Sequence, residues 1–490
     1  MSSGLDSVYP SPCSGRLRRG CWTGAVAAAL CAAASGCGGA AFGDVRETTF
    51  GAAVEASIDE DWEYSAEAAH EYLVGATPDD TRYDRALMLL AEAAENLGLS
   101  YAASMWYLDV GQSRRSPELV DKAVAGLERV VRAGPHDEET IVRGYLASAQ
   151  ISGLRPELEA FVSYQQALDS IRRGLDDWAD TQIAQLPERS PYRVRGRYVQ
   201  AVRALATGDT DGGAEALEDL LDDPDLPPDV KTDAQLALAR LAMEERRFDD
   251  AVEHYEELRR LAPERPELLL EMAWAHFYGG DARRALGLLI ALDAPVYGAL
   301  IAPERYLLEA LCLTRLCQFG PARIAATRLA ERHGDALAEL HAGLPALESH
   351  ALLQAARRRG EGRDIFRFVQ VLRREREHAD DLFRGRLAAE LDRIYGVGLE
   401  ETRRREAEIL QLEVQRLASE LIDAEDGVRL ILHELSVGLL RGRARPPGPP
   451  EADRVEISAG GDQVSYGFRG EFWTDELDDL IVQIEDRCLE

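Results

Sequence analysis

Apolar and polar positions follow a helical period over most of the chain. From about residue 63 to residue 440, apolar residues recur three and four positions apart, and clusters of proline, glycine and aspartate interrupt them at intervals that suit helix hairpins. This stretch contains no convincing run with the two-residue alternation of a strand. The pattern therefore predicts an all-α body made of helix pairs.

Small residues recur in register within this body. Four pairs of alanines are spaced twelve apart, with large apolar residues one or two turns away: Ala91 and Ala103, Ala239 and Ala251, Ala273 and Ala285, and Ala310 and Ala322. The last three pairs begin 34 and then 37 positions apart. The alternative is a generic all-α domain in which alanines pair by chance. Three consecutive pairs in register favour a repeat array.

The sequence of residues 248–263, FDDAVEHYEELRRLAP, resembles the second helix of a tetratricopeptide repeat (TPR). The resemblance covers about 232–330 and, less completely, 82–110. It implies a TPR-like α-α superhelix, or solenoid, over residues 63–350, whose groove is lined by the first helices of the repeats and captures extended peptides or partner helices. It makes four positions candidates for partner binding: Arg240, Glu244, Trp274 and Tyr278. For Trp274 and Tyr278, packing against a neighbouring repeat is an equal alternative.

Residues 351–440 are predicted to be charged helices with a heptad seam. Apolar residues there alternate spacings of four and three: Leu410, Val414, Leu417, Leu421, Ala424, Val428, Ile431 and Leu435. Such a stripe either docks onto the preceding superhelix or zips with a partner. Self-assembly through residues 410–435 is a third, weaker possibility for the function of the chain.

The C-terminal part differs in character from the helical body. Residues 441–450, RGRARPPGPP, form a proline-rich linker. Residues 451–490 are predicted to be a small β-containing module, with strand-like runs at 455–458 and 463–468 and a third strand or short helix at 480–484. A dense aromatic group makes this module a second candidate binding surface: Tyr466, Phe468, Phe472 and Trp473.

The N-terminus carries the pattern of an export signal. Three arginines precede an apolar run that is too short for a permanent membrane span, and the run ends in Ala34-Ser35-Gly36-Cys37. Residues 1–37 therefore resemble a bacterial lipoprotein signal peptide with Cys37 as the lipidated residue. An ordinary secretory signal with a chance cysteine is the alternative. Residues 38–62 are predicted to be a flexible tether, and Gly38 in place of aspartate weakly favours the outer membrane.

Three cysteines remain beyond Cys37, and their spacing matches no zinc site. Cys312 and Cys317 lie five positions apart on a predicted helix, which is a poor geometry for joining each other. Core packing is the favoured interpretation of both. A bond from Cys488 to either of them stays open.

Charge and motifs narrow the possible functions. The net charge of −31 disfavours nucleic acid as a partner, because an acidic surface repels the phosphate backbone. No phosphate-binding loop, nucleophile elbow or paired zinc histidines appear, so we expect no catalytic residue, metal or cofactor. An enzymatic or ligand-binding C-terminal module is the alternative, and it requires a polar pocket around Asp475, Glu476 and Arg487.

These observations predict a non-enzymatic scaffold. The expected protein is anchored to the membrane through Cys37, faces the periplasm from the outer membrane, and binds other envelope proteins or peptides through its TPR groove. Assembly, secretion and motility machinery are all compatible with that description, and the sequence does not select among them.

Overall fold

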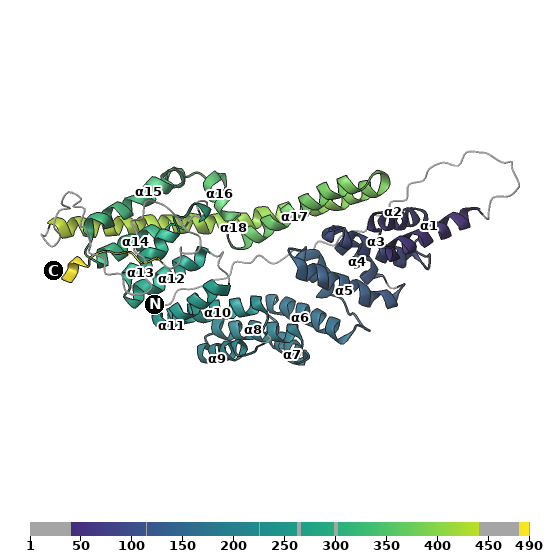
Figure 1. Ribbon diagram of the computed structural model, residues 1–490, viewed down its shortest axis with the longest axis horizontal. Coiled ribbons are helices and arrows are strands. Elements are labelled where there is room, and N and C mark those ends of the chain that lie inside the picture. Colours follow the sequence, from purple (N-terminus) through teal and green to yellow (C-terminus); the bar gives the residue numbers. More distant parts are fainter. Residues whose placement is uncertain are drawn as a thin grey trace. The chain divides into compact units, whose positions relative to one another are not determined.

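The structure is a computed structural model that describes residues 41–113, 115–224, 226–261, 266–297, 302–440 and 480–489. The contacts below all lie within residues 48–490, which form one compact unit. In the described residues every regular element is a helix and no strand is present (Figure 1). The chain is therefore an all-α protein over its described length, as the hydrophobic pattern predicts. The predicted flexible tether over residues 38–62 is corrected for Ala41–Ile58, which are helical and place Ala53 in a hydrophobic core.

The helices form a nearly continuous series. The α-helices of the first half are α1 (Ala41–Ile58), α2 (Trp62–Gly75), α3 (Tyr83–Asn96), α4 (Ser100–Gln112), α5 (Pro117–Ala133), α6 (Pro156–Arg172), α7 (Asp176–Gln185), α8 (Pro191–Ala206) and α9 (Thr210–Leu221). Those of the second half are α10 (Pro228–Glu244), α11 (Phe248–Leu261), α12 (Pro266–Gly279), α13 (Ala282–Ala291), α14 (Glu304–Arg315), α15 (Phe319–His341), α16 (His350–Ala356), α17 (Gly360–Leu382) and α18 (Gly385–Leu440). Four other short helices are η1 (Glu138–Leu146), η2 (Pro295–Tyr297), η3 (Ala346–Glu348) and η4 (Arg487–Leu489).

The predicted alanine pairs lie where paired helices cross. They join α3 to α4, α10 to α11, α12 to α13 and α14 to α15, and each of these pairs of helices is in contact. All eight alanines are 0% exposed: Ala91, Ala103, Ala239, Ala251, Ala273, Ala285, Ala310 and Ala322. Because a methyl group is the largest side chain that lets two helix backbones approach closely, this burial confirms the helix-hairpin register.

Glycine and aspartate set the turn within a hairpin. Between α12 and α13, Gly280 has a φ of +100°, a conformation that costs glycine little. Asp281 follows and accepts a hydrogen bond of 2.9 Å from the backbone N–H of Arg284, which caps the start of α13. Asp209 caps α9 in the same way after Gly208, so α8 and α9 also form a helix hairpin.

Ion pairs connect successive hairpins at the repeat distance. Arg129 on α5 binds Glu95 on α3, which lies 34 residues earlier, and Arg195 on α8 binds Asp229 on α10, which lies 34 residues later. Arg240 and Glu271 are 31 residues apart. Exposed pairs of this kind contribute at most about 1 kcal/mol each. Their value is geometric, since a bidentate arginine fixes the register of one hairpin on the next.

The heptad seam of α18 docks onto the chain itself. Its eight residues, from Leu410 to Leu435, are all less than 9% exposed and belong to the core shared by α10–α16. Figure 1 shows α18 beside α14, α15 and α16, and these helices are in contact. Arg359 donates hydrogen bonds to Glu420, and His341 lies 2.7 Å from Glu425. Of the two alternatives for the seam, the structure shows docking.

The first part of α18 belongs to a different core. Together with α17 it shares a hydrophobic core with the N-terminal half, where it contacts α2 and α4, and Tyr395 is completely buried there. Arg405 donates a hydrogen bond of 2.9 Å to Asp137, the residue that caps η1. The hairpin of α17 and α18 therefore ties the N-terminal hairpins to α14–α16 through a single 56-residue helix.

A buried carboxylate lies at this junction and predicts a pH effect. Glu375 on α17 accepts hydrogen bonds of 2.9 Å from the backbone N–H of Tyr101 and from the hydroxyl of Tyr395. Burial nevertheless raises the pKa of Glu375 above its ordinary value of 4.5. Above pH 4.5 the unfolded chain has released this proton while the folded chain retains it, so the contribution of Glu375 to stability falls as pH rises toward the folded pKa.

We expect Glu375→Gln to remove that dependence, because glutamine keeps the shape and an acceptor oxygen. The free energy of unfolding of the variant should gain on the wild type by at most about 1.4 kcal/mol per pH unit within that window. Urea denaturation between pH 4.5 and pH 8 measures it. Glu377→Gln is the control, since Glu377 is exposed on the same helix. A difference between Glu375→Gln and wild type that stays constant with pH would contradict the assignment.

Two predictions for the C-terminal part are corrected. Residues 480–484 form neither a strand nor a helix; they are extended and lie against α13, where the backbone N–H of Val482 donates to the carbonyl of Arg283. The carbonyl of Arg283, in the first turn of α13, thus takes the place of a strand partner. Cys317 does not serve core packing, because it forms a disulfide with Cys488, whereas Cys312 is a buried free thiol as predicted. The strand-like runs at 455–458 and 463–468 lie outside the described residues.

Candidate functional site

The first helices of the repeats present equivalent positions on one face. The residues one and five places after the buried alanine of each first helix are four apart, so they lie on the same side of the helix. In α10, α12 and α14 these positions hold Arg240 and Glu244, Trp274 and Tyr278, and Leu311 and Arg315. None of the four candidates predicted in the groove is fully buried. Arg240, Glu244 and Tyr278 are exposed, and Trp274 is half-buried.

Aromatic rings gather around the candidate pair on α12. The rings of Trp274 and Tyr278 stack with centroids 5.4 Å apart, and Phe248 at the start of α11 stacks on the other side of Tyr278 at 5.4 Å. The ring of Phe277, also on α12, meets the other two edge-on, with its centroid 5.9 Å from that of Trp274 and 5.5 Å from that of Tyr278. We call Phe248, Trp274, Phe277 and Tyr278 the aromatic cluster. Ring geometries of this type stabilise a cluster beyond the area that it buries.

The next repeat holds the aromatic cluster in place. The guanidinium of Arg315 on α14 lies 5.4 Å from the centre of the Phe277 ring and donates a hydrogen bond of 2.8 Å to the Phe277 carbonyl. Trp274 and Phe277 also pack against the hydrophobic core, whereas Tyr278 is 48% exposed. The cluster is therefore fixed by packing on one side and remains open to a partner at Tyr278. Of the two alternatives for Trp274 and Tyr278, packing against the repeats describes Trp274, and an exposed binding position describes Tyr278.

Arg240 has a structural role. Its guanidinium donates hydrogen bonds of 3.0 and 2.8 Å to the carboxylate of Glu271 on α12, and the hydroxyl of Tyr255 donates to the same carboxylate at 2.9 Å. Burial is the main cause that raises the pKa of Tyr255, and the Glu271 charge adds to it. A partner that bound Arg240 would have to compete with this network, whereas Glu244 is simply exposed.

Several predicted site residues lie outside the described residues. These are Cys37, Tyr466, Phe468, Phe472, Trp473, Asp475 and Glu476. Arg487 is described, and its backbone N–H donates to the carbonyl of Leu316, which places it against the α14–α15 turn. The hypothesis of a polar pocket around Asp475, Glu476 and Arg487 therefore stays a prediction.

Phe248, Phe277 and Arg315 were not among the site residues predicted from the sequence. Arg315 occupies the position in α14 that Tyr278 occupies in α12, 37 residues later, so the repeat register could have found it. Phe248 carries no such signal, because it belongs to a second helix and reaches Tyr278 only through the packing of one hairpin on the next.

Potential metal ligands and the histidine beside Tyr306 also bear on chemistry in the part of the chain that the structure describes. That part contains no group of three or more histidine, cysteine, aspartate or glutamate side chains placed to hold a metal ion. His333 is half-buried beside the Tyr306 ring, and burial lowers its pKa to about 4. Among the helices within the described ranges, none has both the length and the apolar character needed to cross a bilayer.

The geometry defines the class of the protein as an all-α solenoid of TPR-like helix hairpins. No family model matches the chain, and no curated protein matches it. Twenty-eight chains of solved structures match. Among them is the crystal structure of the yeast Tom70, which is 14% identical, with 76% of this chain and 92% of that chain covered and a TM-score of 0.23. At this level of likeness the class rests on the buried alanine register and the helix pairs.

Proposed function

We propose that this chain is a non-enzymatic scaffold of the bacterial cell envelope, anchored through Cys37 to the outer membrane on its periplasmic side, that binds a partner protein at the aromatic cluster. The observation that carries the proposal is the aromatic cluster itself. It is fixed by packing and by Arg315, and three of its four rings lie on α12, a first helix of the kind that lines the groove in TPR-like solenoids. Rigid aromatic anchors of this kind dominate the affinity of protein interfaces.

The charge around the cluster indicates the chemistry of the partner. Asp249, next to Phe248 in the chain, is exposed, and the cation of Arg315 is already occupied at the Phe277 ring and carbonyl. The faces of aromatic rings attract cations, and nearby carboxylates strengthen that attraction. A partner segment that carries arginine or lysine among apolar residues therefore fits this surface better than an acidic segment does.

The disulfide supports an exported location. Cys317 and Cys488 are joined although they are 171 residues apart. Bonds of this type persist in oxidising compartments such as the periplasm and are rare in the cytosol. This agrees with the signal-like residues 1–37, which supply the lipid anchor in the proposal.

The binding part is tested by site-specific photo-crosslinking in the native host. A crosslinking amino acid at position 278 should capture a discrete partner. Position 178 is the control, because Trp178 is also an exposed aromatic residue but lies on α7, outside the aromatic cluster, and the same amino acid there should capture none. With the captured partner purified, Tyr278→Ala should weaken binding about 30-fold, the loss typical of a hot-spot residue, and Trp178→Ala should leave it unchanged. Equal crosslinking at both positions would refute the site.

The anchor is tested separately by metabolic labelling with a palmitate analogue. Wild-type protein should be labelled and fractionate with the outer membrane, whereas Cys37→Ala should be unlabelled and lose that fractionation. If neither form is labelled, the proposed lipid anchor is wrong, and the proposed binding surface at the aromatic cluster is not affected by that result.

A further inference from the structure

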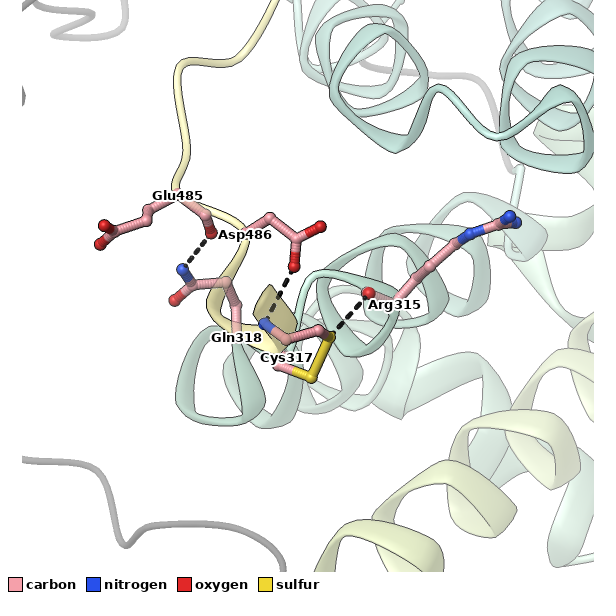
Figure 2. The surroundings of a disulfide bond; sticks show 6 residues. Arg315, Cys317, Gln318, Glu485 and Asp486 are labelled. Atoms are coloured by element: carbon pink, nitrogen blue, oxygen red, sulfur yellow. Dashed lines mark hydrogen bonds between the residues drawn. A yellow bond between two sulfur atoms is a disulfide. The ribbon is translucent and has the colours of Figure 1, made fainter. Parts of the chain in front are cut away.

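The segment of residues 480–487, here called the tail, lies extended between α13 and α15. Its backbone is held at both ends: the N–H of Val482 donates to the carbonyl of Arg283 at 3.3 Å, and the N–H of Arg487 donates to the carbonyl of Leu316 at 3.1 Å. Between them, the Gln318 side chain donates to the carbonyl of Glu485 at 2.7 Å (Figure 2). These contacts recognise main chain, so they do not depend on the sequence of the segment that makes them.

The side chains of the tail alternate between the solenoid and the solvent. Val482 and Ile484 are half-buried and pack against the hydrophobic core, whereas Ile481, Gln483 and Glu485 are exposed. This two-residue period is that of a β-strand laid on a surface, and it is one way in which proteins bind extended peptides.

The surface beneath the tail has room for a backbone. Gly287 on α13 faces the carbonyl of Leu480 so closely that a Cβ at this position would overlap with it. Two neighbouring groups belong to the same surface, the Arg284 side chain, which lies 3.4 Å from the Leu480 carbonyl, and Gln318. We call the surface formed by Arg283, Arg284, Gly287, Leu316 and Gln318, together with the pocket described next, the tail groove.

A pocket of about 280 Å³ opens beside Val482 and is not filled by it. Most of its lining is apolar, and the ion pair of Glu309 and Arg328 forms one side. The lining residues are Leu286, Ile290, Glu309, Leu313, Pro321, Ile324, Ala325, Arg328 and Val482. A larger apolar side chain in the place of Val482 would bury more surface here, since each added methylene strengthens binding about fourfold.

We propose that the tail groove is a binding site for an extended peptide of a partner protein with apolar side chains at every second position, and that the Cys317–Cys488 disulfide keeps the chain's own tail in that site. The tail gives the recognition pattern, because it already satisfies the backbone contacts and the two-residue period. Its small Val482 makes it a weak occupant. This site adjoins the aromatic cluster at Arg315 and Leu316 but uses different side chains, and it does not depend on the role proposed for that cluster.

The disulfide determines whether a partner peptide can compete. While Cys488 is joined to Cys317, the tail cannot leave the groove by more than the reach of a few residues. A dithiol reductant transfers two electrons and two protons to the bond, which yields two cysteine thiols and the oxidised, cyclic form of the reductant. The tail then remains tethered only through the chain that precedes residue 480, at an effective concentration of about millimolar. A free peptide of the same affinity displaces it as its own concentration approaches that value, and a peptide with a larger apolar residue in the place of Val482 does so at a lower concentration.

The experiment measures the binding of a fluorescent peptide to the purified full exported chain by polarisation. The probe is the tail sequence itself, LIVQIEDR, compared with the same peptide carrying Val482→Leu and with one carrying Val482→Asp. The proteins are the oxidised wild type, the wild type reduced with dithiothreitol, Cys488→Ser, and Cys312→Ala as the matched control, because Cys312 is the buried cysteine outside the disulfide.

Binding should be at least tenfold tighter to the reduced wild type and to Cys488→Ser than to the oxidised wild type or Cys312→Ala. The Val482→Leu peptide should bind about fourfold tighter than the tail sequence, and the Val482→Asp peptide should not bind. Gly287→Ala in the Cys488→Ser background should weaken binding at least tenfold. Equal binding to oxidised and reduced protein, or none to the reduced wild type, would overturn the proposal. Dimers formed on reduction without peptide binding would do the same, because a second copy would then be the occupant.

Discussion

Leu417→Ala is expected to lower the free energy of unfolding by about 2–5 kcal/mol. Leu417 lies in the middle of the heptad seam of α18 and is 0% exposed, so truncation removes buried methylene groups and leaves a cavity between α18 and the solenoid. The loss should appear in the isolated monomer and should not depend on protein concentration, because the seam packs on the same chain. Urea denaturation at several protein concentrations measures both properties.

Leu412→Ala provides a matched control for this substitution. It changes the same residue type on the same helix, five positions away, at a side chain that is 67% exposed, and should cost less than about 0.5 kcal/mol. A stability that rises with protein concentration in the wild type, together with a small effect of Leu417→Ala, would show that the seam serves a partner helix instead.

Cys488→Ser is expected to lower the free energy of unfolding by about 2–4 kcal/mol. The bond to Cys317 spans 171 residues and restricts the unfolded chain over α15–α18, and long loops of this kind give the larger stabilisations in the range observed for disulfides. The measurement is denaturant unfolding with and without dithiothreitol. The reductant should lower the stability of the wild type to that of the variant and should leave the variant unchanged.

Cys312→Ala is the control that separates the effect of losing the disulfide from the effect of losing any cysteine side chain. Cys312 is a buried free thiol, and dithiothreitol should affect its variant as strongly as the wild type. If the reductant had no effect on the free energy of unfolding of the wild type, the bond between Cys317 and Cys488 would not restrain the unfolded chain, and the tail would not contribute to stability through it.

Two features of the fold could be predicted from the sequence because each depends on local spacing. The alanines twelve apart, such as Ala273 and Ala285, specify where two helices cross, and that requirement is met within a single hairpin. The seam of α18 likewise follows from heptad spacing. The choice between docking and dimerisation did not follow, because it depends on what faces the stripe, and no pattern within one helix contains that information.

Long-range contacts account for most of what the sequence did not predict. The extended tail has an apolar alternation that suits a strand, but its backbone bonds to the carbonyls of Arg283 and Leu316 and to the side chain of Gln318 instead of to another strand. The sequence left open a bond from Cys488 to Cys312 or Cys317, and nothing in the local pattern around Cys317 selects it as the partner 171 residues away. In the aromatic cluster, Trp274 and Tyr278 were identifiable from their helix face, whereas Phe248 joins them across two hairpins.

The disulfide also changes what a cut in the chain does. The bond between Cys317 and Cys488 closes a covalent ring that contains residues 318–487, including the proline-rich residues 441–450. A single proteolytic nick anywhere in that ring opens it without producing a separate fragment. A nicked molecule would keep its full mass on a non-reducing gel and divide into two pieces only after reduction, so damage to this protein in an oxidising compartment would not release its C-terminal region.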